Sequence, residues 1–240
     1  MAFNGFMKFN NISSKSFPVI LTTPPQPTHP DFVTEEYNIP GRNGTLYSVN
    51  GQRASAQITV NLALVASDTW TNSVPDYTAS YRQVRQWLQG TGRLEFEDRV
   101  DTFYEVQKIQ ITTDERVILN YGNLQVVFTV YPYEFLKSGE EEQATLNNPG
   151  DEAMPLYKIT ATGSGSGTLT VNGYSLSYSF TGAGDLYIDT RRQIAYDAQH
   201  NNKNSKIAGD YNKIKLKHGT NTVAATMGTL KVYPNWGYNI

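Results

Sequence analysis

Alternation of apolar and polar side chains constrains the fold of this chain more than any other feature. Every second residue from Ile58 to Leu64 is Ile, Val or Leu, which places these side chains on one face of a half-buried strand. Two further runs, 103–111 and 124–133, are rich in β-branched and aromatic residues and have strand length. The first half of the chain is therefore predicted to consist mainly of β-strands.

One helix is predicted within this series of strands. Tyr81, Val84, Trp87 and Leu88 fall on one helical face, and Gly90 follows them. Glycine readily adopts the left-handed conformation that ends many helices. A single amphipathic helix among strands must cover a sheet face or the mouth of a barrel.

Asn-Gly pairs mark the positions where tight hairpin turns are expected, because both residues tolerate positive φ. Three pairs occur in the first half, at 4–5, 43–44 and 50–51. A fourth, Asn172-Gly173, separates two alternating runs and predicts a hairpin with a two-residue turn.

The second half of the chain shows no helical periodicity. Strand candidates follow the predicted hairpin at 186–188, 194–196, 214–216, 222–225 and 230–233. Short strands separated by turn residues are typical of an antiparallel sandwich. The Gly-Ser stretch at 163–167 is then a loop or bulge within this sandwich.

A polar stretch separates the two halves and divides the charge unevenly. Residues 137–155 lack periodicity and contain several turn residues, so they are predicted to be a linker. The predicted domains are residues 1–136, with 10 Lys and Arg against 13 Asp and Glu (net −3), and residues 156–240, with 9 against 4 (net +5).

No arrangement of residues points to catalysis, a cofactor or a metal. The chain has no cysteine, and its three histidines, at 29, 200 and 218, lack neighbours at zinc-ligand spacing. Neither a nucleophile elbow nor a phosphate-binding loop is present. The acidic group Glu95, Glu97, Asp98 and Asp101 could supply a glycosidase pair, but its alternation with Leu94 and Phe96 favours a solvated strand face; Asp185 and Asp189 are interpreted in the same way.

No membrane insertion is expected. Residues 1–10 have no apolar core of a signal peptide, and no apolar run approaches the ~20 residues of a membrane span.

Five lysines give the second half a basic stretch: Lys203, Lys206 and the alternating Lys213, Lys215 and Lys217. One reading is a docking surface for an acidic protein or an anionic wall polymer. The other is the outward face of an edge strand, where lysines discourage aggregation.

The order of several short motifs resembles the distal tail proteins (Dit) of long, non-contractile-tailed bacteriophages. The resemblance covers essentially the whole chain, although no single motif is specific. In the first half it rests on Phe3-Asn-Gly-Phe6, residues 37–44, Leu94-Glu-Phe96-Glu-Asp98, Phe103-Tyr104 and Tyr131-Pro132-Tyr133. In the second half it rests on Val171-Asn-Gly173, Ile188-Asp189, Gly219-Thr-Asn221 and Val232-Tyr-Pro234-Asn-Trp236.

This resemblance implies a mainly β fold with two parts: an N-terminal split β-barrel or sandwich with one α-helix, and a C-terminal galectin-like sandwich. It implies a virion protein at the distal end of the tail, assembled in the host cytoplasm. Six copies would form a ring between the tail-tube protein and the tail-tip protein, with docking sites for receptor-binding proteins. DNA would pass through the lumen without specific binding, so we expect a neutral or acidic lumen, because phosphate is attracted by Lys and Arg.

The irregular stretch 24–43 is too long for an ordinary loop. Under the resemblance it is either an arm that reaches a neighbouring subunit or an unstructured loop. Its candidate interface residues are Tyr37, Ile39, Pro40, Gly41, Arg42 and Asn43.

The galectin-like part departs from the sugar-binding pattern of galectins. Residues 200–204 lack the Pro and Arg of that pattern, and Trp236-Gly-Tyr-Asn239 lacks its acid. We therefore expect a protein-docking role for this part. The alternative is a lectin-like tail protein that binds carbohydrate on the host surface.

Overall fold

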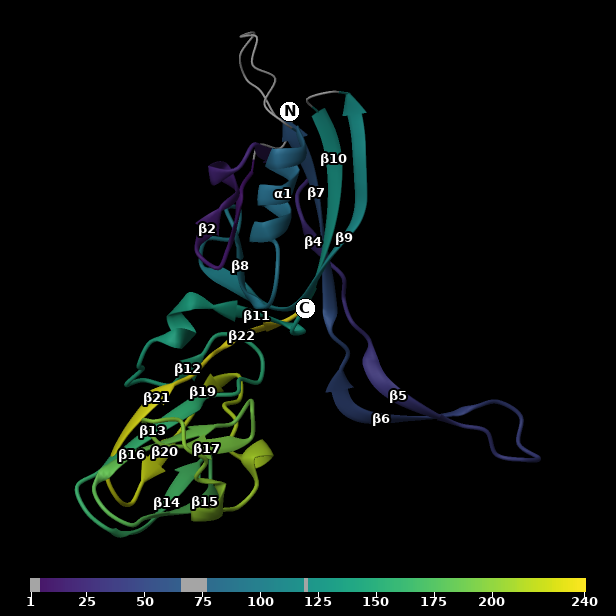
Figure 1. Ribbon diagram of the computed structural model, residues 1–240. Coiled ribbons are helices and arrows are strands. Elements are labelled where there is room, and N and C mark those ends of the chain that lie inside the picture. The colour runs from purple at the N-terminus through teal and green to yellow at the C-terminus, as the bar shows by residue number, and fades with distance from the viewer. Residues whose placement is uncertain (1–4, 66–76, 119–120) are drawn as a thin grey trace. The chain divides into compact units, whose positions relative to one another are not determined.

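The computed structural model describes residues 5–65, 77–118 and 121–240 (Figure 1). The chain divides into two compact units, Met1–Glu134 together with Ile240, and Phe135–Asn239. Both consist mainly of antiparallel β-strands, which confirms the predicted fold class.

The first unit is organised around one antiparallel sheet. Seven strands pair in the order β2 (Ile12–Ser13), β1 (Met7–Phe9), β8 (Gly92–Phe96), β9 (Thr102–Ile118), β10 (Tyr121–Val130), β7 (Ala56–Val65) and β3 (Val19–Leu21). The short β4 (Gln26–Pro27) also pairs with β7, and a 3-10 helix, η1 (Ser14–Ser16), precedes β3.

The alternation in the sequence becomes the two faces of this sheet. β7 pairs with β10 over ten consecutive positions, and Val60 lies opposite Val126. The side chains of Ile58, Val60, Leu62 and Leu64 are buried, as predicted, together with the even-numbered residues of β10.

Helix α1 (Tyr77–Trp87) covers the apolar face of the sheet (Figure 1). Val84, Trp87 and Leu88 are buried, and the Trp87 ring stacks on Phe17 at 4.6 Å between centroids. Gly90 has φ +83°. The predicted helix, its buried face and its left-handed termination are thus confirmed.

The second unit contains two four-stranded antiparallel sheets. One has the order β17 (Ile194–Tyr196), β16 (Gly184–Asp189), β13 (Leu156–Ala161) and β21 (Thr229–Tyr233). The other has the order β18 (Ile207–Ala208), β15 (Tyr174–Phe180), β14 (Gly165–Val171) and β20 (Val223–Ala225). One apolar core contains residues of both sheets, among them Tyr157 and Tyr178.

The predicted two-residue turn joins β14 to β15. Val171 lies opposite Tyr174, and Asn172 and Gly173 have φ +49° and +87°. These angles match the turn type that Asn-Gly favours in hairpins.

Residues 137–155, expected to be a linker, pack instead as part of the second unit. They contain the 3-10 helix η2 (Lys137–Glu140) and β12 (Asn147–Asn148), which pairs with β19 (Gly219–Thr220). Leu146 and Ala153 are buried. The segment has no periodicity because its elements, a four-residue 3-10 helix and a two-residue strand, are too short to show one. β11 (Tyr133–Leu136), which precedes it, pairs with β22 (Gly237–Asn239).

Two local expectations also need correction. Residues 214–216 do not form a strand: Ile214 and Leu216 are buried, but Leu216 makes only an isolated bridge to Ala153. The Asn50-Gly51 pair lies inside a strand, where Gly51 has φ +78° and accompanies an irregularity in the pairing. The 3-10 helices η3 (Asn204–Lys206) and η4 (Tyr211–Lys213) complete the described elements.

Candidate protein interface

The stretch expected to be an arm forms half of a two-stranded hairpin. β5 (Phe32–Tyr37) pairs antiparallel with β6 (Leu46–Arg53), and these two strands form a sheet of their own (Figure 1). Of the predicted arm residues, Tyr37 ends β5, while Ile39, Pro40, Gly41, Arg42 and Asn43 lie in the connecting loop. All six are exposed.

The hairpin exposes more apolar surface than any other segment that the structure describes. Of thirteen exposed large apolar residues, seven belong to it: Phe32, Val33, Tyr37, Ile39, Leu46, Tyr47 and Val49. A two-stranded hairpin alone is marginally stable in water, and clustered exposed apolar side chains mark interaction sites. The hairpin is therefore suited to burial against another surface.

Both faces of the hairpin carry apolar groups. Glu36 lies opposite Tyr47 and shares one face with it, whereas Tyr37 and Leu46 share the other face. The Tyr37 hydroxyl donates a hydrogen bond to Glu35, and this bond raises the pKa of Tyr37. At the base of the hairpin, the Arg53 guanidinium lies 4.5 Å from the centre of the Phe32 ring.

A groove of about 560 Å³ lies between α1 and β9 in the first unit. Its apolar lining comes from Tyr81, Leu88, Ile109 and Ile111, and its polar lining from Arg85, Gln89, Gln110, Thr112 and Asp114. Burial, and then the nearby Asp114 carboxylate, raise the pKa of Tyr81. The groove thus presents more polar than apolar surface, with a cation on the helix side and an anion on the strand side.

β9 (Thr102–Ile118) extends well beyond its pairing with β8. β8 pairs with β9 only from Tyr104 to Val106, whereas β10 follows β9 as far as Ile118. β11 also pairs with β9.

The face of the sheet opposite α1 carries no charged side chain along β7 and β10. A hydrogen-bonded chain crosses it: Gln125 donates to Asn61 at 3.2 Å and accepts from Thr112 at 2.9 Å, and Asn61 donates to Thr23 at 3.1 Å. The outward residues of β7 are Gln57, Thr59, Asn61, Ala63 and Val65, and those of β10 are Tyr121, Asn123, Gln125, Val127 and Thr129.

The three lysines of the expected docking surface do not lie on one strand. Lys213 ends η4, and Lys217 is exposed two residues before β19. Lys215 is half-buried, with its Nζ 2.9 Å from the Glu152 carboxylate. The interpretation of these lysines as a guard against aggregation required an edge strand, and the observed backbone is not one.

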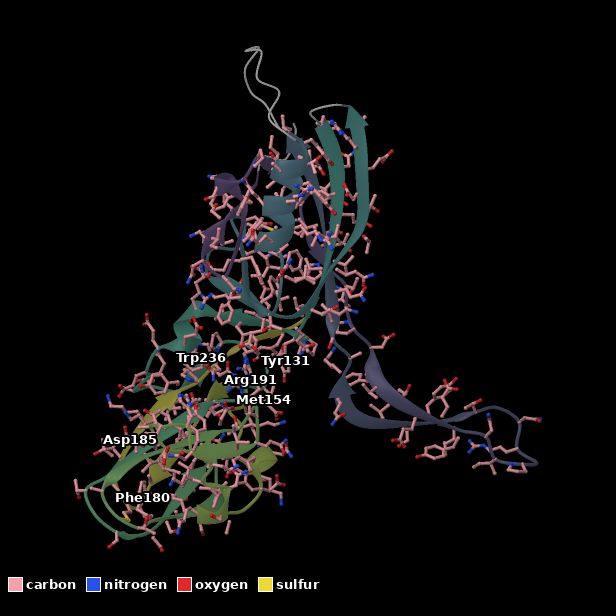
Figure 2. The ribbon with its side chains drawn as sticks, in the orientation of Figure 1. Tyr131, Met154, Phe180, Asp185, Arg191 and Trp236 are labelled. Atoms are coloured by element: carbon pink, nitrogen blue, oxygen red, sulfur yellow. The ribbon has the colours of Figure 1, made fainter. Side chains whose placement is uncertain are left out.

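A cavity of about 550 Å³ lies at one end of the second unit, where Figure 2 places Phe180 and Asp185. The carboxylates of its lining are already engaged by other side chains of the chain. Asp185 accepts from Thr160 and pairs with Lys158, and Asp197 accepts from Asn201 and pairs with Lys203. These hydrogen bonds, led by those from Thr160 and Asn201, lower the pKa of Asp185 and Asp197, respectively.

The other candidate groups are dispersed. His29 is exposed, the His200 ring stacks on Tyr196, and His218 Nδ1 lies 2.9 Å from the Gly150 carbonyl. Glu95 pairs with Arg93 at 2.6 Å. Within the described residues, no three His, Asp or Glu side chains are grouped to hold a metal, and no helix is long and apolar enough to cross a membrane.

The residues that sequence reasoning missed are those of β6 and of the groove. Tyr47 and Val49, 59% and 57% exposed, are the most exposed apolar side chains of the hairpin. They lie outside the predicted arm. The only signal was the apolar composition of residues 46–49, which marks a strand but not its exposure.

Comparison with known proteins shows which fold this is. No family model matches the sequence, and no curated protein matches it. Among solved structures, the Dit protein of phage SPP1, described as a paradigm of the hub adsorption apparatus in phages that infect Gram-positive bacteria, superposes with a TM-score of 0.68. The match covers 95% of this chain and 97% of that chain at 13% sequence identity. The chain therefore shares the Dit fold.

Proposed function

We propose that this chain is a structural hub protein of a phage tail tip. Six copies form a ring that connects the tail tube to the tail-tip protein, and the second unit offers docking sites for receptor-binding components. The observation that carries this proposal is the fold shared with a phage hub protein over nearly the whole length of both chains. The exposed apolar hairpin supports self-assembly, because it requires a covering surface.

Light scattering coupled to size-exclusion chromatography tests the ring. The expected mass is about six times the 26.8 kDa of one chain. Images of negatively stained particles should show closed rings with a central opening. A monomer at every accessible concentration, also when mixed with the tail-tube and tail-tip proteins, would refute the hub role.

The ring requires a channel that does not retain DNA, and we propose that the uncharged face of β7 and β10 lines it. Phosphate binds to Lys and Arg, and neither occurs among the outward residues of these two strands. The variant Gln125→Lys would place a ring of cations on this face. Assembled particles of the variant should gain salt-sensitive DNA binding, whereas particles carrying Lys213→Gln should match the parent protein.

The second candidate is a host-surface lectin, and the cavity at the end of the second unit favours it. This cavity has the volume of a small-ligand site. Saturable binding of the whole chain to host cells, competed by wall polysaccharide and lost in Lys206→Glu, would favour the lectin. Absence of such binding with intact ring assembly would favour the hub.

A further inference from the structure

We infer that Asn43, in the loop between β5 and β6, is a site of spontaneous covalent modification by deamidation. The reaction is intramolecular: the backbone nitrogen of Gly44 attacks the side-chain carbon Cγ of Asn43 and closes a five-membered succinimide ring. The inference concerns the chemistry of the single chain and does not depend on the proposed hub role.

The reaction balances with water as its only co-reactant. The Gly44 nitrogen loses its proton and bonds to Cγ of Asn43, while the bond from Cγ to Nδ2 breaks and the side-chain nitrogen leaves as ammonia. Water then opens the ring at one of its two carbonyl groups. Opening at Cγ gives aspartate, whereas opening at the main-chain carbonyl gives isoaspartate, in which the main chain passes through Cβ and Cγ.

The surroundings of Asn43 leave this attack unobstructed. Glycine has no Cβ to hinder the approach, and a Cβ built on Gly44 would have no heavy atom within 4 Å. Both residues are exposed. Among the residues that the structure describes, none forms a hydrogen bond with the Asn43 side chain or with the Gly44 backbone nitrogen.

The same dipeptide in the second unit is held in place. Asn172 Nδ2 donates a hydrogen bond to the Asn221 side chain at 2.7 Å, and the Asn172 side-chain oxygen accepts one from the Thr222 amide at 2.9 Å. The Asn172 side chain must turn toward the Gly173 nitrogen to react, so both hydrogen bonds must break first. The structure therefore distinguishes two dipeptides that are identical in sequence.

Deamidation changes the charge and the covalent path of the hairpin loop. It adds one negative charge, next to Arg42, to a chain whose net charge is −2. Two contacts close the loop on either side of Asn43: the Arg42 amide donates to the Ile39 carbonyl at 3.1 Å, and the Thr45 hydroxyl donates to the Asn38 side chain at 3.1 Å. Neither contact uses Asn43, so the loop can accommodate the product.

Peptide mass spectrometry of the full chain, sampled during incubation in mildly alkaline buffer, measures the reaction at each site. Asn43 should convert to a mixture of aspartate and isoaspartate, and an enzyme that methylates isoaspartate should label the second product. Conversion of Asn172 should be about thirtyfold slower, the factor that corresponds to breaking two ordinary hydrogen bonds. In urea that unfolds the chain, the difference between the two sites should largely disappear.

Two variants serve as controls at the exposed loop. Asn43→Gln keeps the amide but would require a six-membered ring, so residue 43 should remain unmodified. Gly44→Ala keeps Asn43 but places a Cβ beside the attacking nitrogen, so its conversion should slow several-fold.

Four outcomes would overturn the inference. Equal rates at Asn43 and Asn172 in the folded chain, or a difference that persists undiminished in urea, would show that the fold does not select the site. An Asn43 that reacts in urea but stays intact in the folded chain would show that the loop prevents the attack. Aspartate without any isoaspartate would show direct hydrolysis in place of the ring.

Discussion

Replacement of Asn221 by alanine should strongly destabilise the second unit. Asn221 is 7% exposed, and its side-chain oxygen accepts hydrogen bonds from Asn172 Nδ2 at 2.7 Å and from the Lys217 amide at 2.8 Å. Its side-chain nitrogen donates to the carbonyls of Lys217 and Gly219 at 2.8 and 2.7 Å. One amide group thus joins the β14–β15 turn to the segment that leads into β19.

The expected loss of unfolding free energy follows from these four hydrogen bonds. Each contributes about 1 kcal/mol net, and their partners are half in contact with water, so Asn221→Ala should lower the unfolding free energy by about 3 kcal/mol. In a unit of this size, a loss of about 3 kcal/mol corresponds to a decrease in Tm of more than about 10 °C.

Asn221→Asp separates hydrogen bonding from shape. Aspartate keeps the size of the side chain but replaces the donor nitrogen by an oxygen that faces two carbonyl oxygens. The Asn221→Asp variant should therefore lose at least as much unfolding free energy as the alanine variant. As a control, Asn212→Ala removes an exposed amide with one hydrogen bond of 3.2 Å, and it should change the stability by less than about 0.5 kcal/mol.

Urea unfolding followed by circular dichroism, together with calorimetry, measures these differences. The reasoning is refuted if Asn221→Ala lies within about 1 kcal/mol of the parent protein, or if Asn221→Asp is as stable as the parent. Either result would show that the segment after β18 holds its conformation without this amide.

Three further outcomes are expected. Gly150→Ala should lower the Tm of the protein, because an added Cβ would collide with a backbone carbonyl of β22, and a stability equal to the parent would contradict this. Hydrogen bonds, first from the Asn201 side chain, lower the pKa of Asp197. They therefore stabilise the folded state above the ordinary carboxyl pKa, and this stability is lost as the pH falls. Asp197→Asn should flatten the acid limb of a plot of Tm against pH, and an unchanged limb would contradict this. Tyr47→Ser should weaken ring assembly about thirtyfold, a loss of about 2 kcal/mol for an interface aromatic, while Tyr174→Ser should not; equal assembly by light scattering would contradict this.

The elements that could be predicted are those whose pattern lies within a short stretch of sequence. The buried side of β7, the buried face of α1 with the left-handed Gly90, and the Asn172-Gly173 turn all depend on residues close together in sequence. Periodicity and turn preference act over a few residues, so a single sequence carries them.

The expectations that needed correction concern contacts between distant segments. Leu146, Ala153 and Leu216 each lie in polar surroundings in the sequence, yet they are buried because residues 137–155 pack against residues 214–221. The Asn50-Gly51 pair suits a turn locally, but β5 continues beside it and makes it an irregularity within β6.

The sequence by itself therefore determined the mainly β character, the helix that ends before Gly90 and the turn at 172–173, because each depends on short-range pattern. Only the tertiary structure decided that the apolar residues of the hairpin remain exposed and that residues 137–155 pack within the second unit. Periodicity shows that a side chain is apolar, whereas exposure depends on which distant segment covers it.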